Sequence, residues 1–67
     1  MKALGKRIKE LRKVQGISQE DLSYEADIPL SQVGRIERGE INPTISSIAA
    51  IASALKLELK EIFNFRY

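Results

Sequence analysis

The sequence predicts an all-α protein with five short helices packed in one domain that covers residues 1–67. Leucines and isoleucines recur at the three- and four-residue intervals of a helix, and no segment alternates as a half-buried strand would. Glycine, proline and capping residues divide the periodic segments. A 67-residue chain with 43% hydrophobic residues and no cysteine must rely on one small, well-packed core, and dimerisation would help it.

The first helix is expected over about residues 2–14, where Leu4, Ile8 and Leu11 share one face. Six lysines and arginines against a single glutamate give residues 1–13 a local charge of +5. A basic element of this kind favours a polyanion as its neighbour. An ordinary solvated helix face explains the charge equally well, so the charge alone leaves both interpretations open.

The second helix is expected to begin after Ser18 and to end near Ala26. A serine hydroxyl there can accept a hydrogen bond from the N–H three residues later, and Pro29 favours an extended conformation for the residue before it. The third helix should begin at Pro29 or Leu30, because proline is tolerated in a first turn, and should end at Gly39.

The fourth helix is expected to follow Thr44, a suitable N-cap, and to bury a wide apolar face. The residues of that face are Ile45, Ile48, Ile51, Ala52 and Leu55. A short fifth helix is expected over about residues 58–63, and residues 64–67 form a tail with two aromatic side chains.

The second and third helices are joined only by Asp27-Ile28-Pro29, and two short helices with so short a turn form a helix-turn-helix, here over about residues 18–38. In such a unit the second helix enters the major groove of DNA. The segments Ile17-Ser-Gln-Glu-Asp-Leu22 and Val33-Gly-Arg-Ile-Glu-Arg-Gly39 resemble the lambda-repressor and Cro-like domains of the xenobiotic-response-element type. The resemblance extends from about Leu4 to Phe63, which is nearly the whole chain.

The resemblance implies a sequence-specific transcriptional regulator that works as a symmetric dimer on a palindromic operator in double-stranded DNA. It implies that the third helix is the recognition helix, whose residues facing bases or nearby phosphates are Leu30, Ser31, Gln32 and Arg35. It also implies that Gln19 contacts a phosphate and braces the recognition helix.

The resemblance places Arg12 and Glu37 at positions that often form a partly buried ion pair between the first and third helices. Each residue lies beside the apolar stripe of its own helix, which is compatible with such a pair. If they pair, removing one partner leaves a buried charge. The alternative is two separate surface charges that contribute almost nothing to stability.

The residue types of the third helix suit the reading of base edges. The guanidinium of Arg35 can bind guanine through two hydrogen bonds, and Gln32 pairs well with adenine. For Arg35, a phosphate contact or a free surface charge is the alternative. Ser31 can bond to a base or cap its own helix, and Leu30 can touch a thymine methyl group or pack at the turn.

Arg38 and Asn42 flank the end of the third helix, where they can reach phosphates together with backbone N–H groups of the loop between them. Ordinary loop polarity is the alternative. The sequence departs from the resembled pattern at Pro29, where a serine or threonine usually caps the recognition helix. It departs also at Leu30, where a polar base reader is common, and at Ser23, which replaces a small apolar alanine.

Four apolar residues near the C-terminal end are candidates for a dimer contact: Leu59, Phe63, Phe65 and Tyr67. A monomer of this size has little core to absorb them, and a single half-site gives limited affinity for DNA. The alternative is that the tail folds back onto the core of its own chain.

No catalytic constellation is present, because the chain has no histidine, no cysteine and no phosphate-binding glycine loop. We therefore expect a protein that is not an enzyme and that uses no metal and no cofactor. No apolar run approaches the ~18 residues of a membrane span, and the first residues lack an apolar signal core, so we expect a cytoplasmic protein. Because the sequence ends just after the fifth helix, we expect no attached effector domain.

An alternative function is that of a protein-interaction module, such as an antitoxin that binds a toxin and represses its own operon. A toxin-like neighbouring gene would favour it. A membrane-surface amphipathic protein is a third alternative, but the apolar stripe of the first helix is too narrow to favour it over a core face.

Overall fold

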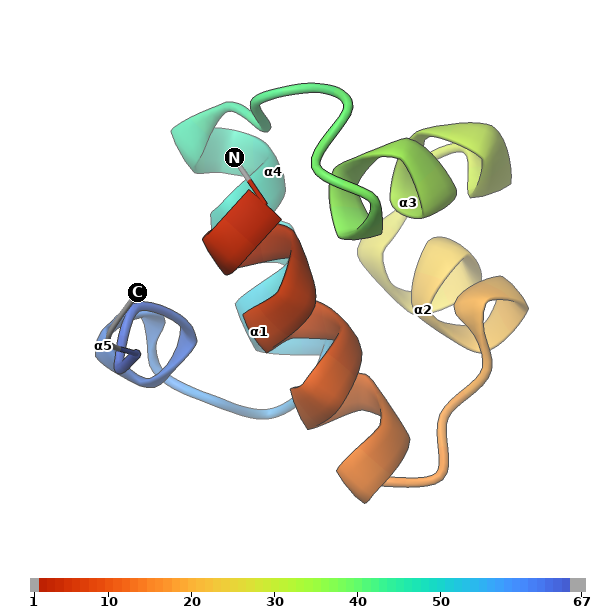
Figure 1. Ribbon diagram of the computed structural model, residues 1–67. Helices are drawn as coiled ribbons and strands as arrows, with labels where there is room; N and C mark the ends of the chain where they lie inside the picture. The colour runs from red at the N-terminus through yellow and green to blue at the C-terminus, as the bar shows by residue number, and fades with distance from the viewer. Residues whose placement is uncertain (1, 66–67) are drawn as a thin grey trace.

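The protein is a bundle of short helices, described for residues 2–65 by a computed structural model (Figure 1). The helices are α1 (Lys2–Val14), α2 (Gln19–Ala26), α3 (Leu30–Glu37), α4 (Ile45–Ala54) and α5 (Leu59–Ile62). In this part of the chain there is no strand, so the predicted all-α class and helix order are confirmed. In Figure 1, α1 crosses in front of α4, with α2 and α3 to one side and α5 to the other.

Local hydrogen bonds begin and end these helices where the sequence predicts. The Ser18 hydroxyl accepts from the Asp21 N–H at 3.0 Å, and the Asp21 carboxylate accepts from the Ser18 N–H at 3.3 Å, which closes a capping box at the start of α2. Thr44 caps α4 by accepting from the Ser47 N–H at 3.0 Å. Just after α3, Gly39 has a φ of +75°, in the left-handed region that glycine adopts without strain.

The core receives side chains from every one of these helices. The most deeply buried are Leu4, Ile8, Leu22, Val33, Ile36, Ile51, Leu55 and Ile62. Ile45 does not join them: it is 69% exposed, and the expectation that it belongs to the buried face of α4 is wrong. It is the first residue of α4, and α2 and α5, which pack on that helix, leave this end uncovered.

The end of α3 lies directly against the backbone of α1 at Gly5. A Cβ at this position would overlap the carbonyl oxygen of Ile36 and would lie 2.7 Å from the carbonyl oxygen of Glu37. Only glycine fits this crossing, which explains a residue that otherwise weakens a helix interior. The close approach fixes the distance between α1 and the end of α3.

The short helix α5 is held against α1 by Arg7. Its guanidinium donates to the carbonyl oxygen of Glu61, from Nε at 3.2 Å and from Nη2 at 3.0 Å. Carbonyl groups in the last turn of a helix have no partner within the helix. The Glu61 carbonyl accepts from the Asn64 N–H at 3.4 Å, and Arg7 adds a partner from a neighbouring element. The position of α5 therefore depends on α1 as well as on its own contacts with the core.

Candidate nucleic-acid interface

The turn between α2 and α3 is fixed by three local features. Asp27 adopts the left-handed conformation with a φ of 56°. The Ser23 hydroxyl donates to the carbonyl oxygen of Ile28 at 2.5 Å, and the Ile28 N–H donates to the carbonyl oxygen of Ser23 at 3.1 Å. Pro29 then takes the N-cap position of α3. The serine at position 23 therefore ties the end of α2 to the start of α3.

The third helix has a buried side and an exposed side. Val33 and Ile36 are almost completely buried, whereas Leu30 is 44% exposed and Arg35 points into solvent. Ser31 is exposed as well, and Gln32 is half-buried. The residues expected to face DNA thus lie on the outer part of α3, away from the core.

The start of α3 carries no side-chain cap among the described residues, so Ser31 is not used to cap its own helix. Its side chain is exposed to solvent. Leu30 keeps close to half of its surface exposed and is therefore available for an apolar contact with a ligand as well. Both side chains stand in the first turn of α3, the part of a recognition helix that meets base edges.

The end of α3 gathers charged side chains around Glu40. The Arg38 guanidinium donates from Nε to Glu40 Oε2 at 2.6 Å, and the Arg35 Nε lies 3.9 Å from Glu40 Oε1. The hydrogen bond between Arg38 and Glu40 raises the pKa of Arg38 and lowers the pKa of Glu40 from their ordinary values. Asn42 follows in an exposed loop. The two arginines therefore share one carboxylate on the molecular surface.

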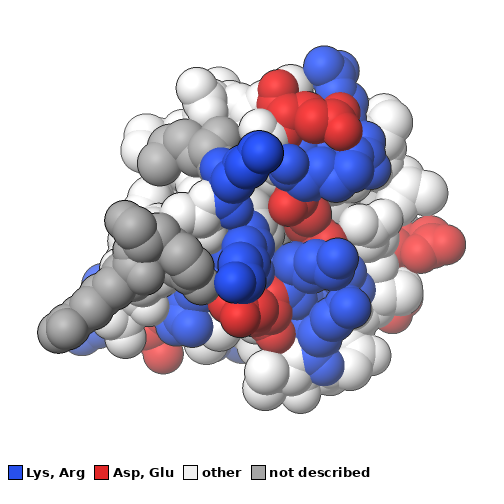
Figure 2. Space-filling model, in the orientation of Figure 1, with Lys and Arg blue, Asp and Glu red and all other residues white. Residues whose placement is uncertain are grey.

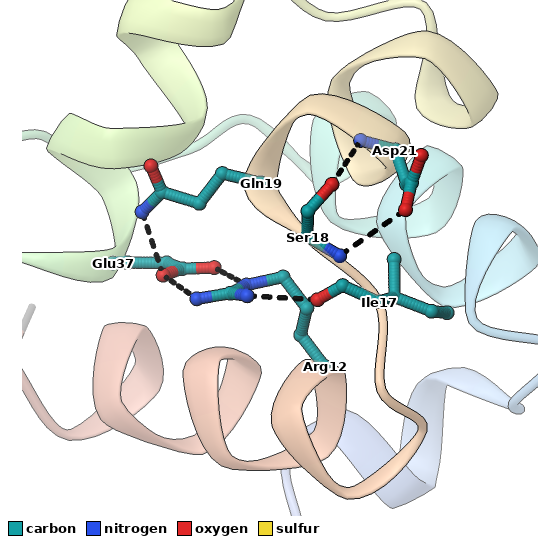
Figure 3. A network of polar contacts seen from close by, with 6 residues as sticks. All are labelled: Arg12, Ile17, Ser18, Gln19, Asp21 and Glu37. Carbon is teal, nitrogen blue, oxygen red and sulfur yellow. Dashed lines mark hydrogen bonds and ion pairs between the residues drawn. The ribbon is translucent and has the colours of Figure 1, made fainter.

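A buried polar network joins α1, α2 and α3 (Figure 3). Arg12 donates from Nε to Glu37 Oε2 at 2.7 Å and from Nη2 to Glu37 Oε1 at 3.0 Å, and its Nη1 donates to the carbonyl oxygen of Ile17 at 2.8 Å. Gln19 adds a bond from Nε2 to Glu37 Oε1 at 3.0 Å. The hydrogen bond to Glu37 raises the pKa of the Arg12 guanidinium further above its ordinary value. The network fixes the end of α3 relative to the start of α2.

Basic side chains gather on the face formed by α1 and the end of α3, with a few acidic groups between them (Figure 2). The exposed basic residues of these two segments are Lys2, Lys6, Lys9, Lys13, Arg35 and Arg38. The start of α1 touches the end of α3, because a Cβ at Gly39 would lie 2.7 Å from Lys2 Cγ. The basic first helix therefore continues the charge of α3, and a surface of this kind attracts a polyanion.

The apolar residues expected at a dimer contact divide into three groups. Leu59 and Phe63 are 40% and 43% exposed and stand at the two ends of α5. Phe65 is half-buried and packs against the core of its own chain. This position agrees with the alternative in which the tail folds back onto that core. Tyr67 lies outside the described residues. The exposed apolar surface of this region is therefore carried by Leu59 and Phe63.

Sequence reasoning missed three residues that shape this site. Gly5 lies inside the expected first helix and was therefore not singled out. Glycine destabilises a helix interior, so its presence there is a signal of a close contact. Ser23 was noticed only as a departure from the resembled pattern, and its bond to Ile28 was not foreseen. Glu40 gave no signal, because its contact with Arg38 depends on the path of the chain after α3.

Within residues 2–65, no group of three or more acidic, cysteine or histidine side chains is placed to hold a metal ion. Among the same residues, no helix is both long and apolar enough to cross a membrane.

A short turn followed by a helix with a buried side and a polar outer side defines a helix-turn-helix protein. The model of the helix-turn-helix family matches residues 8–62, and the chain belongs to that family. The immunity repressor protein of Bacillus phage phi105 is 36% identical over 59 residues, which make up 88% of this chain and 41% of the repressor. The chain thus spans less than half the length of that relative.

Two solved structures are similar over almost the whole chain. The restriction-modification controller protein C.AhdI from Aeromonas hydrophila has a TM-score of 0.91 and 39% sequence identity, covering 92% of this chain and 94% of that protein. The nucleoprotein complex C.Esp1396I gives a TM-score of 0.80 at 29% identity, covering 96% of this chain and 94% of the other. The similarity therefore includes all the elements that build the site.

Proposed function

We propose that the chain is a sequence-specific DNA-binding transcriptional regulator that places α3 in the major groove. The observation that carries this proposal is the division of α3, which buries Val33 and Ile36 and exposes Leu30, Ser31 and Arg35. Polar and cationic side chains on a helix after a tight turn suit the donor and acceptor pattern of base edges. The relatives named as repressor, controller and nucleoprotein complex support the same function. Because its ligand would be cellular DNA, we propose that it acts in the cytoplasm. We also propose that it has no catalytic role.

The outer residues of α3 have separate roles in this proposal. Arg35 binds guanine O6 and N7 through two hydrogen bonds, and Gln32 pairs with the N6 and N7 edge of adenine. Ser31 donates to or accepts from a neighbouring base, since a hydroxyl can do both. Leu30 meets a thymine methyl group, which needs an exposed apolar side chain at the start of the helix.

Phosphate contacts are proposed for Gln19, Arg38 and Asn42, which surround the outer face of α3. The amide nitrogen of Gln19 carries a second hydrogen besides the one given to Glu37. Gln19 is also the first residue of α2, where a helix end favours an anion. Contacts of this kind position a protein on DNA without reading its sequence.

We propose further that two copies bind a palindromic operator as a symmetric dimer. One module of this size covers few base pairs, whereas two modules read half-sites about one helical turn, or about 34 Å, apart. The outer face of α3 is taken by DNA, and Leu59 and Phe63 offer an exposed apolar surface on another element. In a two-fold contact the same surface of each copy meets its equivalent.

Selection of binding sites from a pool of random duplexes tests sequence-specific binding. We expect enrichment of a palindromic consensus with two half-sites about one helical turn apart. A pool that shows no enrichment after repeated selection would contradict sequence-specific binding. A single asymmetric half-site as the consensus would contradict the dimer but leave the reading role of α3 intact.

Ultracentrifugation of the protein, alone and on the selected duplex, tests the dimer. Leu59→Glu should weaken self-association and operator binding together while helical content is retained, because the change places charge on an apolar contact. Tyr24→Glu is the matched control, since Tyr24 is an 85% exposed apolar residue that lies on α2, outside the basic face of α1. One monomer bound per operator at saturation, or equal effects of both substitutions, would contradict the dimer contact.

A further inference from the structure

We propose that Glu40 is a specificity-determining residue. In the free protein its carboxylate holds Arg35 and Arg38 at the end of α3. It thereby opposes the binding of these two arginines to the phosphates of DNA that lacks the operator. This role rests on the proposed function. Glu40 itself contacts no base of the DNA. Glu40 instead acts as an internal competitor of the DNA phosphate. A carboxylate is suited to this, because it presents two oxygen acceptors to a guanidinium in much the same way as a phosphate does.

The contact is well formed on the side of Arg38. Its guanidinium reaches Glu40 with two nitrogens, from Nε to Oε2 at 2.6 Å and from Nη2 to Oε1 at 3.4 Å. Arg35 approaches the same carboxylate more loosely, with its Nε 3.9 Å from Oε1. All three side chains are about half exposed, so an incoming phosphate can reach them.

The backbone after α3 places Glu40 at this point. The Glu40 N–H donates to the carbonyl oxygen of Arg35 at 2.9 Å and the Gly39 N–H to that of Ile36 at 3.0 Å, with Gly39 in the left-handed conformation. This is the hydrogen-bond pattern that commonly closes the end of a helix. The helix dipole disfavours a negative charge at this end, so the carboxylate is stabilised there by the two arginines.

Gly34 explains why Arg38 can occupy this place. A Cβ at Gly34 would lie 3.0 Å from Arg38 Nη1 and 3.8 Å from Gln19 Oε1. The guanidinium of Arg38 therefore rests against the bare backbone of α3, close to the side chain proposed to contact a phosphate from α2. Gly34 makes room for Arg38 on the surface that would face DNA.

The competition affects the two kinds of DNA differently. Binding to non-operator DNA depends almost entirely on phosphate contacts, and Glu40 competes with a phosphate for Arg35 and for the Nε and Nη2 edge of Arg38. On the operator, Arg35 exchanges its loose 3.9 Å contact with Glu40 for a base edge. Arg38 meets its phosphate there through Nη1, which forms no bond to Glu40, so the carboxylate keeps its contacts with Nε and Nη2. Glu40 therefore opposes non-operator binding more strongly than operator binding.

Equilibrium binding of the protein to the selected operator and to a scrambled duplex of equal length tests this role at several salt concentrations. Glu40→Gln should raise affinity for the scrambled duplex by about three- to tenfold, with a salt slope larger by about one per additional phosphate contact. Affinity for the operator should change by a smaller factor, so the ratio of the two affinities falls. Glu25→Gln is the matched control: it removes the same charge from an exposed glutamate that forms no ion pair within residues 2–65.

Two outcomes separate this proposal from the one on which it rests. If the wild-type protein prefers the operator and Glu40→Gln behaves as Glu25→Gln does on both duplexes, the role of Glu40 is overturned and the proposed function stands. If the wild-type protein binds no duplex, both are overturned. A second measurement needs no DNA: NMR reports the mobility of the Arg38 Nε–H group. This mobility should increase in Glu40→Gln and stay unchanged in Glu25→Gln. Equal mobility in the wild type and both variants would contradict the proposal.

Discussion

Arg12 near the end of α1 and Glu37 at the end of α3 form a buried ion pair through two hydrogen bonds, at 2.7 Å and 3.0 Å. Their side chains are only 9% and 2% exposed. The remaining polar atoms of the pair are satisfied by Ile17 and Gln19, and no buried side-chain nitrogen or oxygen within residues 2–65 lacks a hydrogen bond. The pair therefore fixes the direction in which α3 presents its outer face.

Breaking this pair should cost a large part of the stability of the domain. Glu37→Gln or Arg12→Met leaves one buried charge without its partner, which typically costs about 3–5 kcal/mol. A domain of this size has a total free energy of unfolding of about 3–10 kcal/mol. Urea unfolding followed by circular dichroism measures the loss. Arg12→Met combined with Glu37→Leu should be less damaging than either single change, and single changes that each cost under about 1 kcal/mol would indicate a surface-like pair.

Two glycines inside helices should respond in opposite ways to replacement by alanine. Gly5→Ala should destabilise the protein by about 1–3 kcal/mol, because its new methyl group meets backbone carbonyls of Ile36 and Glu37 that cannot move aside. Gly34→Ala should leave stability unchanged or raise it by up to about 1 kcal/mol, since the nearest atom belongs to the flexible end of Arg38. Thermal unfolding compares them, and equal shifts in Tm would contradict the close crossing at Gly5.

The fold could be predicted largely from local signals, because each helix carries its own periodicity and cap. Ser18 and Thr44 begin their helices through hydrogen bonds to residues three positions away, which is information contained in a short stretch of sequence. Ile45 shows the limit of periodicity: it has the right spacing for the core, yet no neighbouring element covers its end of α4. Whether a face is covered depends on tertiary packing.

The outer residues of the candidate site were also predictable, because the buried stripe of α3 determines which residues point away from it. Contacts between elements far apart in the sequence were not, as the bond from Arg7 to Glu61 shows. Glu40 was missed for a different reason: it lies only two residues after Arg38, but their contact depends on the left-handed conformation of Gly39 between them. A left-handed residue after a helix changes the path of the chain, and sequence spacing alone does not give the resulting distances.

Gln19→Ala should weaken binding to operator and scrambled duplexes alike, by about five- to tenfold, which corresponds to a loss of about 1–1.4 kcal/mol, the net contribution of one hydrogen bond. The domain should remain folded, although the loss of the bond from Gln19 to Glu37 lowers stability by about 1 kcal/mol. Fluorescence anisotropy measures the affinities, with circular dichroism as a check on folding. Unchanged affinity for both duplexes in a folded variant would reject a phosphate contact by Gln19.

The Glu40 carboxyl should titrate with a pKa below the ordinary glutamate value of about 4.3, because Arg38 donates hydrogen bonds to its charged form. A lowered pKa means that the ion pair is fully present above the ordinary value and is lost as pH falls through the lowered one. An NMR titration of the side-chain carboxyl carbon measures it. Arg38→Gln should return the pKa toward its ordinary value, and identical midpoints in both proteins would contradict the contact.

Binding-site selection with the wild type and with a variant carrying Ser31→Ala, Gln32→Ala and Arg35→Ala measures whether the outer face of α3 reads DNA. These side chains are outside the core, so the variant should fold and keep its affinity for unselected DNA within a small factor. We predict a defined consensus for the wild type and none for the variant, with a loss of about 1–3 kcal/mol of discrimination for Arg35 alone. The same consensus recovered with both proteins would contradict the reading of DNA by α3.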